Sequence, residues 1–262
     1  MKKDNYYIEL IQKYEPVFLE AGKLSVKLQS EVTAKKKLAT GTYEIDVVTD
    51  ADIQIQETIL SALSKTELSE CRVVAEEKTE FVNKFNPDGE LLLAIDPIDG
   101  TYRYAAGTPI YNMIISIQRF GVPLYTFTHY PAIGWTHKFI GKVHRESGQR
   151  PILSIKNTKN VITYSYGNPK EKVPEIVRQK MEARGYTFLD KKELTSDCGA
   201  TTILLAEAVG GYYCEDPLVV DGLVGMHYAL ARNLEIQSDI AKEPKPRLGG
   251  IRYSGYYFVT RK

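Results

Sequence analysis

Apolar residues recur every three or four positions over two stretches in the first part of the chain. This spacing predicts a helix from about Asp4 to Leu28 and a second helix from Asp50 to Leu63. The segment between them carries Lys35-Lys36-Lys37 and then Gly41, a composition that favours a loop. The chain therefore begins with helical elements on either side of a polar connection.

Short apolar runs follow the second helix, and each is bounded by polar or turn-forming residues. Runs of this length and spacing indicate one antiparallel-rich sheet with helices on one face. The predicted strands are Val73-Val74, Leu91–Ile95, Met113–Arg119, Leu124–Thr128 and Trp135–Ile140.

The pattern changes after residue 150, where strands and helices alternate. We expect strands at Val161–Ser165, Tyr212-Tyr213 and Gly255–Thr260, and helices at Val173–Arg184, Gly199–Val209 and Asp221–Ala231. The change predicts two sub-domains, residues 1–150 and 151–262, with a ligand cleft between them.

Composition narrows the class of protein. Of 262 residues, 43% are hydrophobic and 26% charged, which is typical of a globular protein. The 34 basic and 33 acidic residues nearly cancel, so no overall field attracts a nucleic acid polymer or a membrane. No apolar run approaches a membrane span, and the polar start lacks a signal-peptide core, so we expect a cytoplasmic protein. The three cysteines lack metal-ligand spacing and are expected to be thiols, and the four histidines are expected to be structural.

The most informative segment is Asp96-Pro97-Ile98-Asp99-Gly100-Thr101, which follows the apolar run Leu91–Ile95. Pro97 lacks a backbone donor and is expected to break the strand, which lets both aspartates turn toward a common point. Paired carboxylates suit a hard cation such as Mg²⁺ that completes its shell with phosphate. Ordinary turn chemistry explains the same residues equally well.

Other acidic residues also sit where a strand ends or a helix begins. Glu76-Glu77 follows Arg72-Val73-Val74, Asp52 lies at the start of the second helix, and Asp221 precedes Gly222. A solvated strand exit would account for the glutamates and helix capping for each aspartate. All these groups together, at junctions of the same kind, favour one acidic site.

In this order and at these separations, Glu76-Glu77, residues 96–101 and Asp221 resemble the inositol monophosphatase family of metal-dependent, lithium-sensitive phosphatases. Val48-Thr49-x-x-Asp52 is similar to an upstream element of that family, and Gly199-Ala200 to a later helix start. The resemblance covers nearly the whole chain. It implies a mixed α/β fold, a layered αβαβα sandwich of the sugar-phosphatase type.

The resemblance also implies roles for individual residues and two or three Mg²⁺ ions. Glu76, Asp96 and the Ile98 carbonyl would hold one ion, and Asp96, Asp99 and Asp221 a second. Thr101 with Asp52 would orient and help deprotonate the attacking water beside Glu76. Backbone N–H groups of Gly100 and Thr101 would face the phosphate.

Departures from the family concern the substrate. Val220 stands where the family commonly has Trp, and Cys214 stands where inositol phosphatases place a Glu that Glu215 could replace. Tyr102-Arg103-Tyr104 also differs, and Arg103 could pair with a second phosphate or a carboxylate. The expected substrate contacts are Tyr102, Arg103, Gly199, Ala200 and Glu215.

These observations predict a Mg²⁺-dependent phosphomonoesterase that acts on a small phosphorylated metabolite. Inositol monophosphate-like compounds, sugar or polyol phosphates and 3′-phosphoadenosine nucleotides stay open as substrates, and a homodimer is possible. The alternative is a catalytically silent relative that binds phosphorylated metabolites for regulation.

Overall fold

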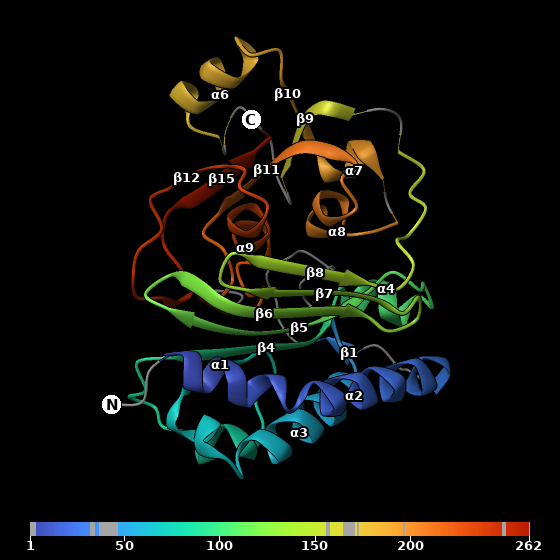
Figure 1. The fold of residues 1–262 in the computed structure, drawn as a ribbon. Coiled ribbons are helices and arrows are strands. Elements are labelled where there is room, and N and C mark those ends of the chain that lie inside the picture. Colours follow the sequence, from blue (N-terminus) through green and yellow to red (C-terminus); the bar gives the residue numbers. More distant parts are fainter. Residues whose placement is uncertain are drawn as a thin grey trace.

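The computed structural model describes residues 4–31, 35–36, 47–155, 158–164, 171, 173–195, 197–247 and 250–261. Helices and sheets stack in five layers (Figure 1). A helical layer from the N-terminal part covers a six-stranded sheet, two helices follow, then a five-stranded sheet, and α6 (Glu175–Glu182) lies on the far side. The predicted αβαβα sandwich is confirmed.

The first helical layer consists of α1 (Asp4–Gln12), α2 (Glu15–Leu28) and α3 (Asp50–Leu63). The sequence predicts one helix across residues 4–28, but the structure divides it at a turn. Pro16 stands in the first turn of α2, where its missing N–H is tolerated but cannot continue α1. The bounds of α3 are as predicted. Within the segment predicted as a loop, the structure forms a short strand at Lys35–Lys36 (β1), which pairs with Val47–Val48 (β2). Residues 37–41 of the predicted loop lie outside the described residues.

The six-stranded sheet runs in the order β3-β4-β5-β6-β7-β8. Its first pair is parallel and all later pairs are antiparallel, which confirms the antiparallel-rich sheet. The last strand was not predicted, because it has only one half-buried position and no apolar alternation. The strands are β3 (Arg72–Ala75), β4 (Leu92–Asp99), β5 (Asn112–Arg119), β6 (Val122–Tyr130), β7 (Trp135–Ile140) and β8 (Val143–Ser147).

The five-stranded sheet has the order β10-β9-β11-β15-β12. Parallel pairs join β9 to β10 and β11, whereas β15 pairs antiparallel with β11 and β12. The strands are β9 (Thr158–Tyr164), β10 (Thr187–Asp190), β11 (Val209–Glu215), β12 (Glu235–Ser238) and β15 (Tyr256–Thr260), and a separate hairpin contains β13 (Lys245–Arg247) and β14 (Gly250–Arg252).

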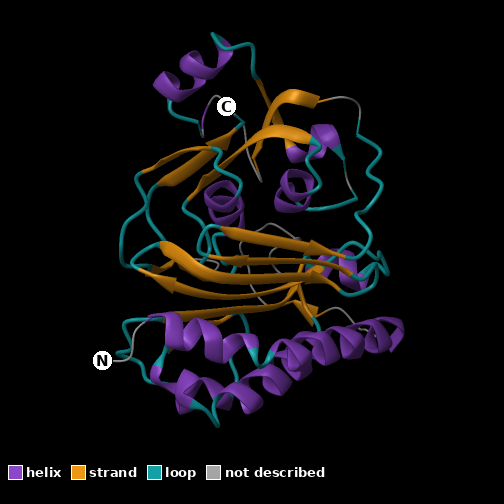
Figure 2. Cartoon of the chain, viewed as in Figure 1, coloured by secondary structure: helices purple, strands orange, loops and turns teal. Residues whose placement is uncertain are grey.

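Short helices connect these strands (Figure 2). Two of them are shorter than the sequence predicts, since α8 ends before residue 209 and α9 begins after Asp221. They are α4 (Thr101–Ala105), α7 (Lys191–Leu194), α8 (Ala200–Leu205) and α9 (Val224–Ala231), with 3₁₀ turns at Gln29–Glu31, Glu67–Glu70 and Glu80–Lys84. No helix of the described residues is long and apolar enough to cross a membrane.

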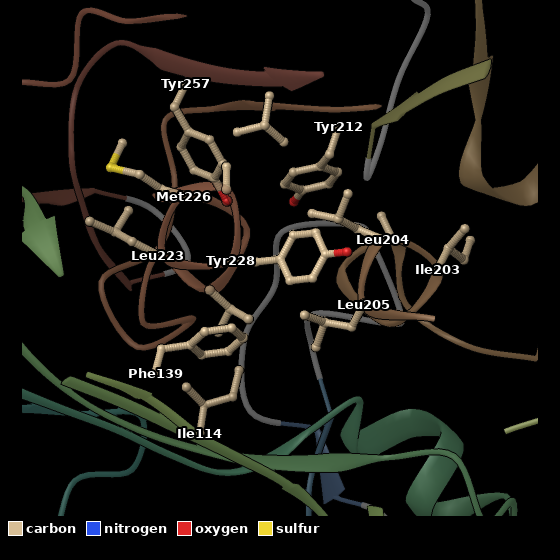
Figure 3. Close-up of a cluster of buried hydrophobic side chains, with 14 of the residues drawn as sticks. Ile114, Phe139, Ile203, Leu204, Leu205, Tyr212, Leu223, Met226, Tyr228 and Tyr257 are labelled. Carbon is tan, nitrogen blue, oxygen red and sulfur yellow. The ribbon is translucent and has the colours of Figure 1, made fainter. Parts of the chain in front are cut away.

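One hydrophobic core joins the two sheets through α8 and α9. Figure 3 shows Ile114 and Phe139 of the six-stranded sheet below these helices and Tyr212 and Tyr257 of the five-stranded sheet above them. Six of the eight residues of α9 are buried, so this helix is enclosed on all sides. At Gly225, a Cβ would lie 2.9 Å from Tyr257 Oη, so the close approach requires glycine. Burial of each large apolar side chain contributes about 1.5–3 kcal/mol, which holds both sheets in a fixed relation around the site.

Candidate active site

The end of β4 carries the two aspartates of the 96–101 segment. The sequence predicts that Pro97 ends this strand, but strand geometry continues to Asp99. Pairing with β5 is irregular here, since Asp96 lies opposite Ile114 whereas Asp99 lies opposite Asn112, which leaves one extra residue in β4. A bulge of this kind accommodates the missing N–H of proline and redirects the side chains. Asp96 Oδ1 accepts a hydrogen bond of 3.0 Å from the Ile98 N–H.

A left-handed turn at Gly100 follows the bulge. Its φ of +92° favours glycine, and it brings Thr101 to the start of α4. Thr101 Oγ1 lies 3.1 Å from the Ile98 carbonyl oxygen and 3.3 Å from Asp52 Oδ1. The turn therefore connects residues 96–101 to the first helical layer.

Asp52 has both of the functions that the sequence left open. Its Oδ2 accepts hydrogen bonds from Thr49 N (2.8 Å) and Thr49 Oγ1 (2.5 Å), so it closes a capping box at the start of α3. Its Oδ1 faces Thr101. Burial raises the pKa of Asp52 to about 7, although the Thr49 hydrogen bonds oppose this rise, and the charges of Glu76 and Glu77 contribute to it. Capping alone does not account for this residue.

The glutamate pair lies at the end of β3, beside Asp52. Carboxylate oxygens of Asp52, Glu76 and Glu77 lie within 4.8 Å of one another. Glu77 is buried, and Gln56 fixes its backbone by accepting from its N–H (2.9 Å) and donating to its carbonyl (2.7 Å). A solvated strand exit is therefore the wrong interpretation of Glu76-Glu77.

Asp221 joins this group from the C-terminal part of the chain. The sequence left open that it is an ordinary helix cap, but α9 begins later, with Leu223 at the N-cap and no side-chain cap hydrogen bond. The pKa of Asp221 is raised to about 8, first by burial and then by the charges of Asp99 and Glu76, whereas Arg252 opposes the rise. This repulsion indicates that Asp221, in the loop before α9, lies close to the carboxylates at the ends of β3 and β4.

The four carboxylates of Glu76, Asp96, Asp99 and Asp221, here called the acidic cluster, fit a divalent cation. Burial and mutual repulsion raise the pKa of Asp96 well above its usual range, with Glu76, Asp99 and Asp221 all contributing. Burial also raises the pKa of Asp99, against the opposing charge of Arg103. Hard oxygen donors that repel one another in this way are the ligands Mg²⁺ prefers, and a bound cation would remove the repulsion.

A thiol mechanism has no support at this site. Burial raises the pKa of Cys198 to about 12, against the opposing charges of Arg103 and Lys191, so the group is a neutral thiol. Burial likewise raises the pKa of Cys214 to about 12. No nucleophilic thiolate is therefore available near neutral pH.

Two of the histidines form a group that sequence spacing did not indicate. His137 and His144 face each other across the β7–β8 pair, with their nearest ring nitrogens 2.9 Å apart, and Glu146 completes the group. Glu146 accepts hydrogen bonds from Trp135 and Arg150, which already compensate its charge. Alternation of residues along a strand could have indicated this group only if the register of the β7–β8 hairpin had been known.

The predicted substrate contacts differ in burial, from the buried Arg103 to the exposed Glu215. Arg103 is buried, and its guanidinium carbon stacks 4.6 Å from the Tyr102 ring centroid. A Cβ on Gly199 would lie 3.9 Å from the terminal nitrogens of Arg103, so residues 102, 103 and 199 come together. Glu215 is exposed at the end of β11. The charge of Asp221 contributes to the raised pKa of the neighbouring Cys214. Sequence reasoning missed the buried Lys191, because a lysine beside other polar residues normally marks a surface.

Comparisons with known proteins agree with this architecture. A Staphylococcal inositol monophosphatase I complexed with products is 18% identical, with a TM-score of 0.63 over 99% of this chain and 92% of that chain. A Thermotoga maritima inositol monophosphatase is 21% identical, with a TM-score of 0.63 over 96% of this chain and 92% of that chain. A dual-specific inositol monophosphatase/NADP phosphatase bound to D-inositol-1-phosphate is 19% identical, with a TM-score of 0.61 over 99% and 92%. A comparison with curated proteins finds no match.

The layered fold is that of solved inositol monophosphatases, and the acidic cluster offers the hard oxygen donors that a divalent metal ion requires. The model of the inositol monophosphatase family matches residues 12–185, so the chain belongs to that family. It is therefore a phosphomonoesterase of small phosphorylated metabolites.

Proposed function

We propose that this protein hydrolyses a small phosphomonoester by attack of a water molecule, with Mg²⁺ held by Glu76, Asp96, Asp99, Asp221 and the Ile98 carbonyl. The observation that carries the proposal is the raised pKa of three aspartates, two from the end of β4 and one from the loop before α9. Asp96 is buried, and Asp99 and Asp221 are half-buried. Such a group needs cations, and a phosphomonoester needs the same positive charge to accept a nucleophile. Two or three ions are consistent with this number of ligands.

Thr101 is the residue that we expect to orient the water. Its hydroxyl proton can be donated to Asp52 Oδ1 or to the Ile98 carbonyl, which leaves an oxygen lone pair to accept a hydrogen bond from water. Asp52, whose pKa is raised to about 7, is well matched to receive a proton near neutral pH. Glu76 lies within the same carboxylate group and would hold the same water from the other side. Bound Mg²⁺ would supply charge neutralisation and lower the pKa of that water.

The phosphate is proposed to lie against the turn after β4. The backbone N–H groups of Gly100 and Thr101 belong to this turn, and its left-handed geometry exposes successive backbone donors. Tyr102, Arg103, Gly199, Ala200 and Glu215 are the proposed contacts of the leaving group. Arg103 has the strongest structural support among them, whereas Glu215 has the weakest because it is exposed.

Inositol monophosphate-like compounds, sugar or polyol phosphates and 3′-phosphoadenosine nucleotides are the proposed substrate classes. The first is compatible with a structural neighbour whose name includes D-inositol-1-phosphate. The same name includes NADP phosphatase, and NADP carries its phosphate on the 2′ rather than the 3′ oxygen of the adenosine ribose, so it is related to the last class but not identical with it. Two sub-domains at residues 1–150 and 151–262, a homodimer, a cytoplasmic location and inhibition by lithium stay predictions.

Phosphate release from a panel of inositol, sugar and adenosine phosphates, measured with and without Mg²⁺, tests the proposed function. We expect hydrolysis that requires the metal. Calorimetric binding of a metabolite without turnover would instead favour the silent, regulatory relative and contradict the proposal.

A further inference from the structure

Arg103 is a buried cation with little to compensate it. The residue is only 6% exposed, and its Nε has no hydrogen-bond partner. No ion pair joins its guanidinium to a carboxylate within the described residues, although exposed or half-buried arginines such as Arg119 and Arg247 do form such pairs. Burial of a charge is costly unless a partner of opposite charge is present. Asp99 is the acidic residue that feels the charge of Arg103, but it belongs to the acidic cluster.

A second buried cation lies in α7, the helix that follows strand β10 of the five-stranded sheet. Lys191, the first residue of α7, is only 4% exposed and likewise forms no ion pair among the residues that the structure describes. Burial and the charge of Arg103 both lower the pKa of Lys191, which shows that the two charges are close enough to repel each other. Cys198 lies near both but is a neutral thiol and offers no negative charge. Arg103 and Lys191, here called the basic pair, therefore have no ion-pair partner among the residues that the structure describes.

The basic pair lies directly beside the proposed phosphate position. A Cβ on Gly100 would come within 2.7 Å of Arg103 Nη1, so the guanidinium contacts the turn that follows β4. On the other side, a Cβ on Gly199 would be 3.9 Å from both terminal nitrogens. The Tyr102 ring stacks against the guanidinium, and the Tyr130 hydroxyl, which donates to Thr202 Oγ1 at 3.1 Å, is within reach of the same charge. Gly100, Gly199, the Tyr102 ring and the Tyr130 hydroxyl therefore lie around the N–H donors of the Arg103 guanidinium.

We propose that the basic pair binds a second phosphate group carried by the leaving group of the substrate, so that the preferred substrate is a doubly phosphorylated small metabolite. This inference rests on the proposed function and names its substrate class. An arginine fork binds phosphate oxygens through two parallel hydrogen bonds, and a lysine adds a third donor. The acidic cluster would hold the ions that act on the first phosphate, while the basic pair holds the second.

Matched substrates test the inference. Adenosine 3′,5′-bisphosphate is compared with adenosine 3′-monophosphate, fructose 1,6-bisphosphate with fructose 1-phosphate, and 2-phosphoglycerate with glycerol 2-phosphate. We expect kcat/KM to favour the doubly phosphorylated member of at least one of the first two pairs by about tenfold or more, the value of one well-made charge-assisted contact. A preference seen only in the third pair would show that the basic pair binds a carboxylate, and it would contradict the proposal that this pair binds a second phosphate.

Variants then assign the preference to the basic pair. In Arg103→Gln the preference is expected to fall toward one, in Lys191→Gln to fall partly, and in Arg103→Lys to be intermediate because the charge stays but the fork is lost. Arg145→Gln, which changes an exposed arginine, is the matched control and should keep the full preference. A preference that survives in both Arg103→Gln and Lys191→Gln would overturn the assignment.

A measurement without metal separates this inference from the proposed function. In the presence of a chelator, sulfate should raise the melting temperature of the wild-type protein and of Asp99→Asn, but not of Arg103→Gln, because only the basic pair then attracts an anion. If no phosphomonoester of any kind is hydrolysed, the proposed function fails while the sulfate experiment still tests the basic pair. Hydrolysis of mono- and bisphosphates at equal kcat/KM, together with no stabilisation by sulfate, would overturn the inference alone.

Discussion

Two groups of buried charges lie side by side in this protein, and they have opposite signs. The acidic cluster combines carboxylates from the ends of β3 and β4 with Asp221 from the loop before α9, and their mutual repulsion raises the pKa of each aspartate. The basic pair combines one residue of α4 with one of α7. If the two groups served only stability, ion pairs between them would be expected. Instead each keeps its charge for a ligand, cations on one side and an anion on the other.

The separation has a structural reason. Arg103 lies in α4, directly after the turn that follows Asp99, and its guanidinium acts on that carboxylate and lies beside Gly199. Gly100 leaves room for the guanidinium in this position, since a Cβ there would lie 2.7 Å from Arg103 Nη1. Charges that are held apart in this way destabilise the free protein and become favourable only when ligands bind.

The largest expected effect comes from removing one charge of the acidic cluster. Asp99→Asn should lower kcat/KM by at least about a hundredfold, because even residues outside the ligand shell of a metal change activity by 10–100-fold. In the presence of a chelator the same variant should be more stable than the wild type, since it relieves repulsion. Phosphate release and thermal melting measure the two effects, with the exposed Asp88→Asn as control. Unchanged activity in Asp99→Asn would show that the acidic cluster is not the catalytic site.

Thr101 lies between Asp99 and Arg103 in the sequence and carries no charge, so replacing its hydroxyl tests positioning alone. Thr101→Val keeps the shape but loses the hydroxyl that contacts Asp52 and the Ile98 carbonyl. We expect kcat to fall about a hundredfold with KM nearly constant, the magnitude of one general acid–base contribution. Steady-state kinetics check this, with the exposed Thr58→Val in α3 as the control. A rise in KM at constant kcat would instead make Thr101 a binding residue.

The pH dependence of stability distinguishes the two groups. A carboxyl group whose pKa is higher in the folded protein than in the unfolded chain binds more protons when folded, so stability falls as pH rises between the two values. The pKa of Asp52 at about 7 and that of Asp221 at about 8 therefore make the metal-free protein less stable as pH rises from about 6.5 to about 8. The expected loss is roughly 5 °C in melting temperature, because one excess proton contributes about 1.4 kcal/mol per pH unit.

Saturating Mg²⁺ should flatten this dependence, since ligated carboxylates stay ionised. The measurement leaves out lower pH because burial lowers the pKa of His129 and His227 to about 4. Below about pH 6.5 these two histidines make stability rise with pH, which opposes the effect of the carboxylates. A flat profile in the metal-free wild type would contradict the repulsion in the acidic cluster.

The smallest effect is expected at Glu215, whose charge is exposed rather than buried. Glu215→Gln should change kcat/KM by no more than about threefold, because exposed charges contribute little in water. Michaelis–Menten kinetics with the preferred substrate are sufficient. A tenfold or larger rise in KM would place Glu215 directly on the substrate and reduce the contrast between buried and exposed charges.

Much of the fold could be predicted from local pattern. Strands β5 and β7 and helix α3 lie where apolar spacing predicts them. β7 and α3 each bury one face or stripe, whereas β5 is a continuous apolar run that is buried on both faces. The predictions failed where local and tertiary preferences differ. β8 is an exposed edge strand without alternation, and α9 begins after Asp221 because Gly222 and Leu223 first take left-handed conformations.

The metal ligands could be predicted as candidates for a simple physical reason. Asp96 and Asp99 are close in sequence, so a bulge around Pro97 is enough to bring them together. The roles of Glu77 and Lys191 could not be predicted in this way, because burial of a charged side chain depends on which elements pack over it. The His137–His144 contact likewise depends on hairpin register.

The sequence by itself determined the order of the elements, the family to which the chain belongs, and the residue types that can hold Mg²⁺. Those properties are local, because they follow from spacing, turn chemistry and the donor atoms of individual side chains. Only the tertiary structure decided that Asp221 joins Asp99 and that Arg103 meets Lys191, both buried and without an ion pair among the described residues. The physical reason is that the cost of a buried charge depends on its neighbours, and these neighbours come from different sheets held together by the core around α8 and α9.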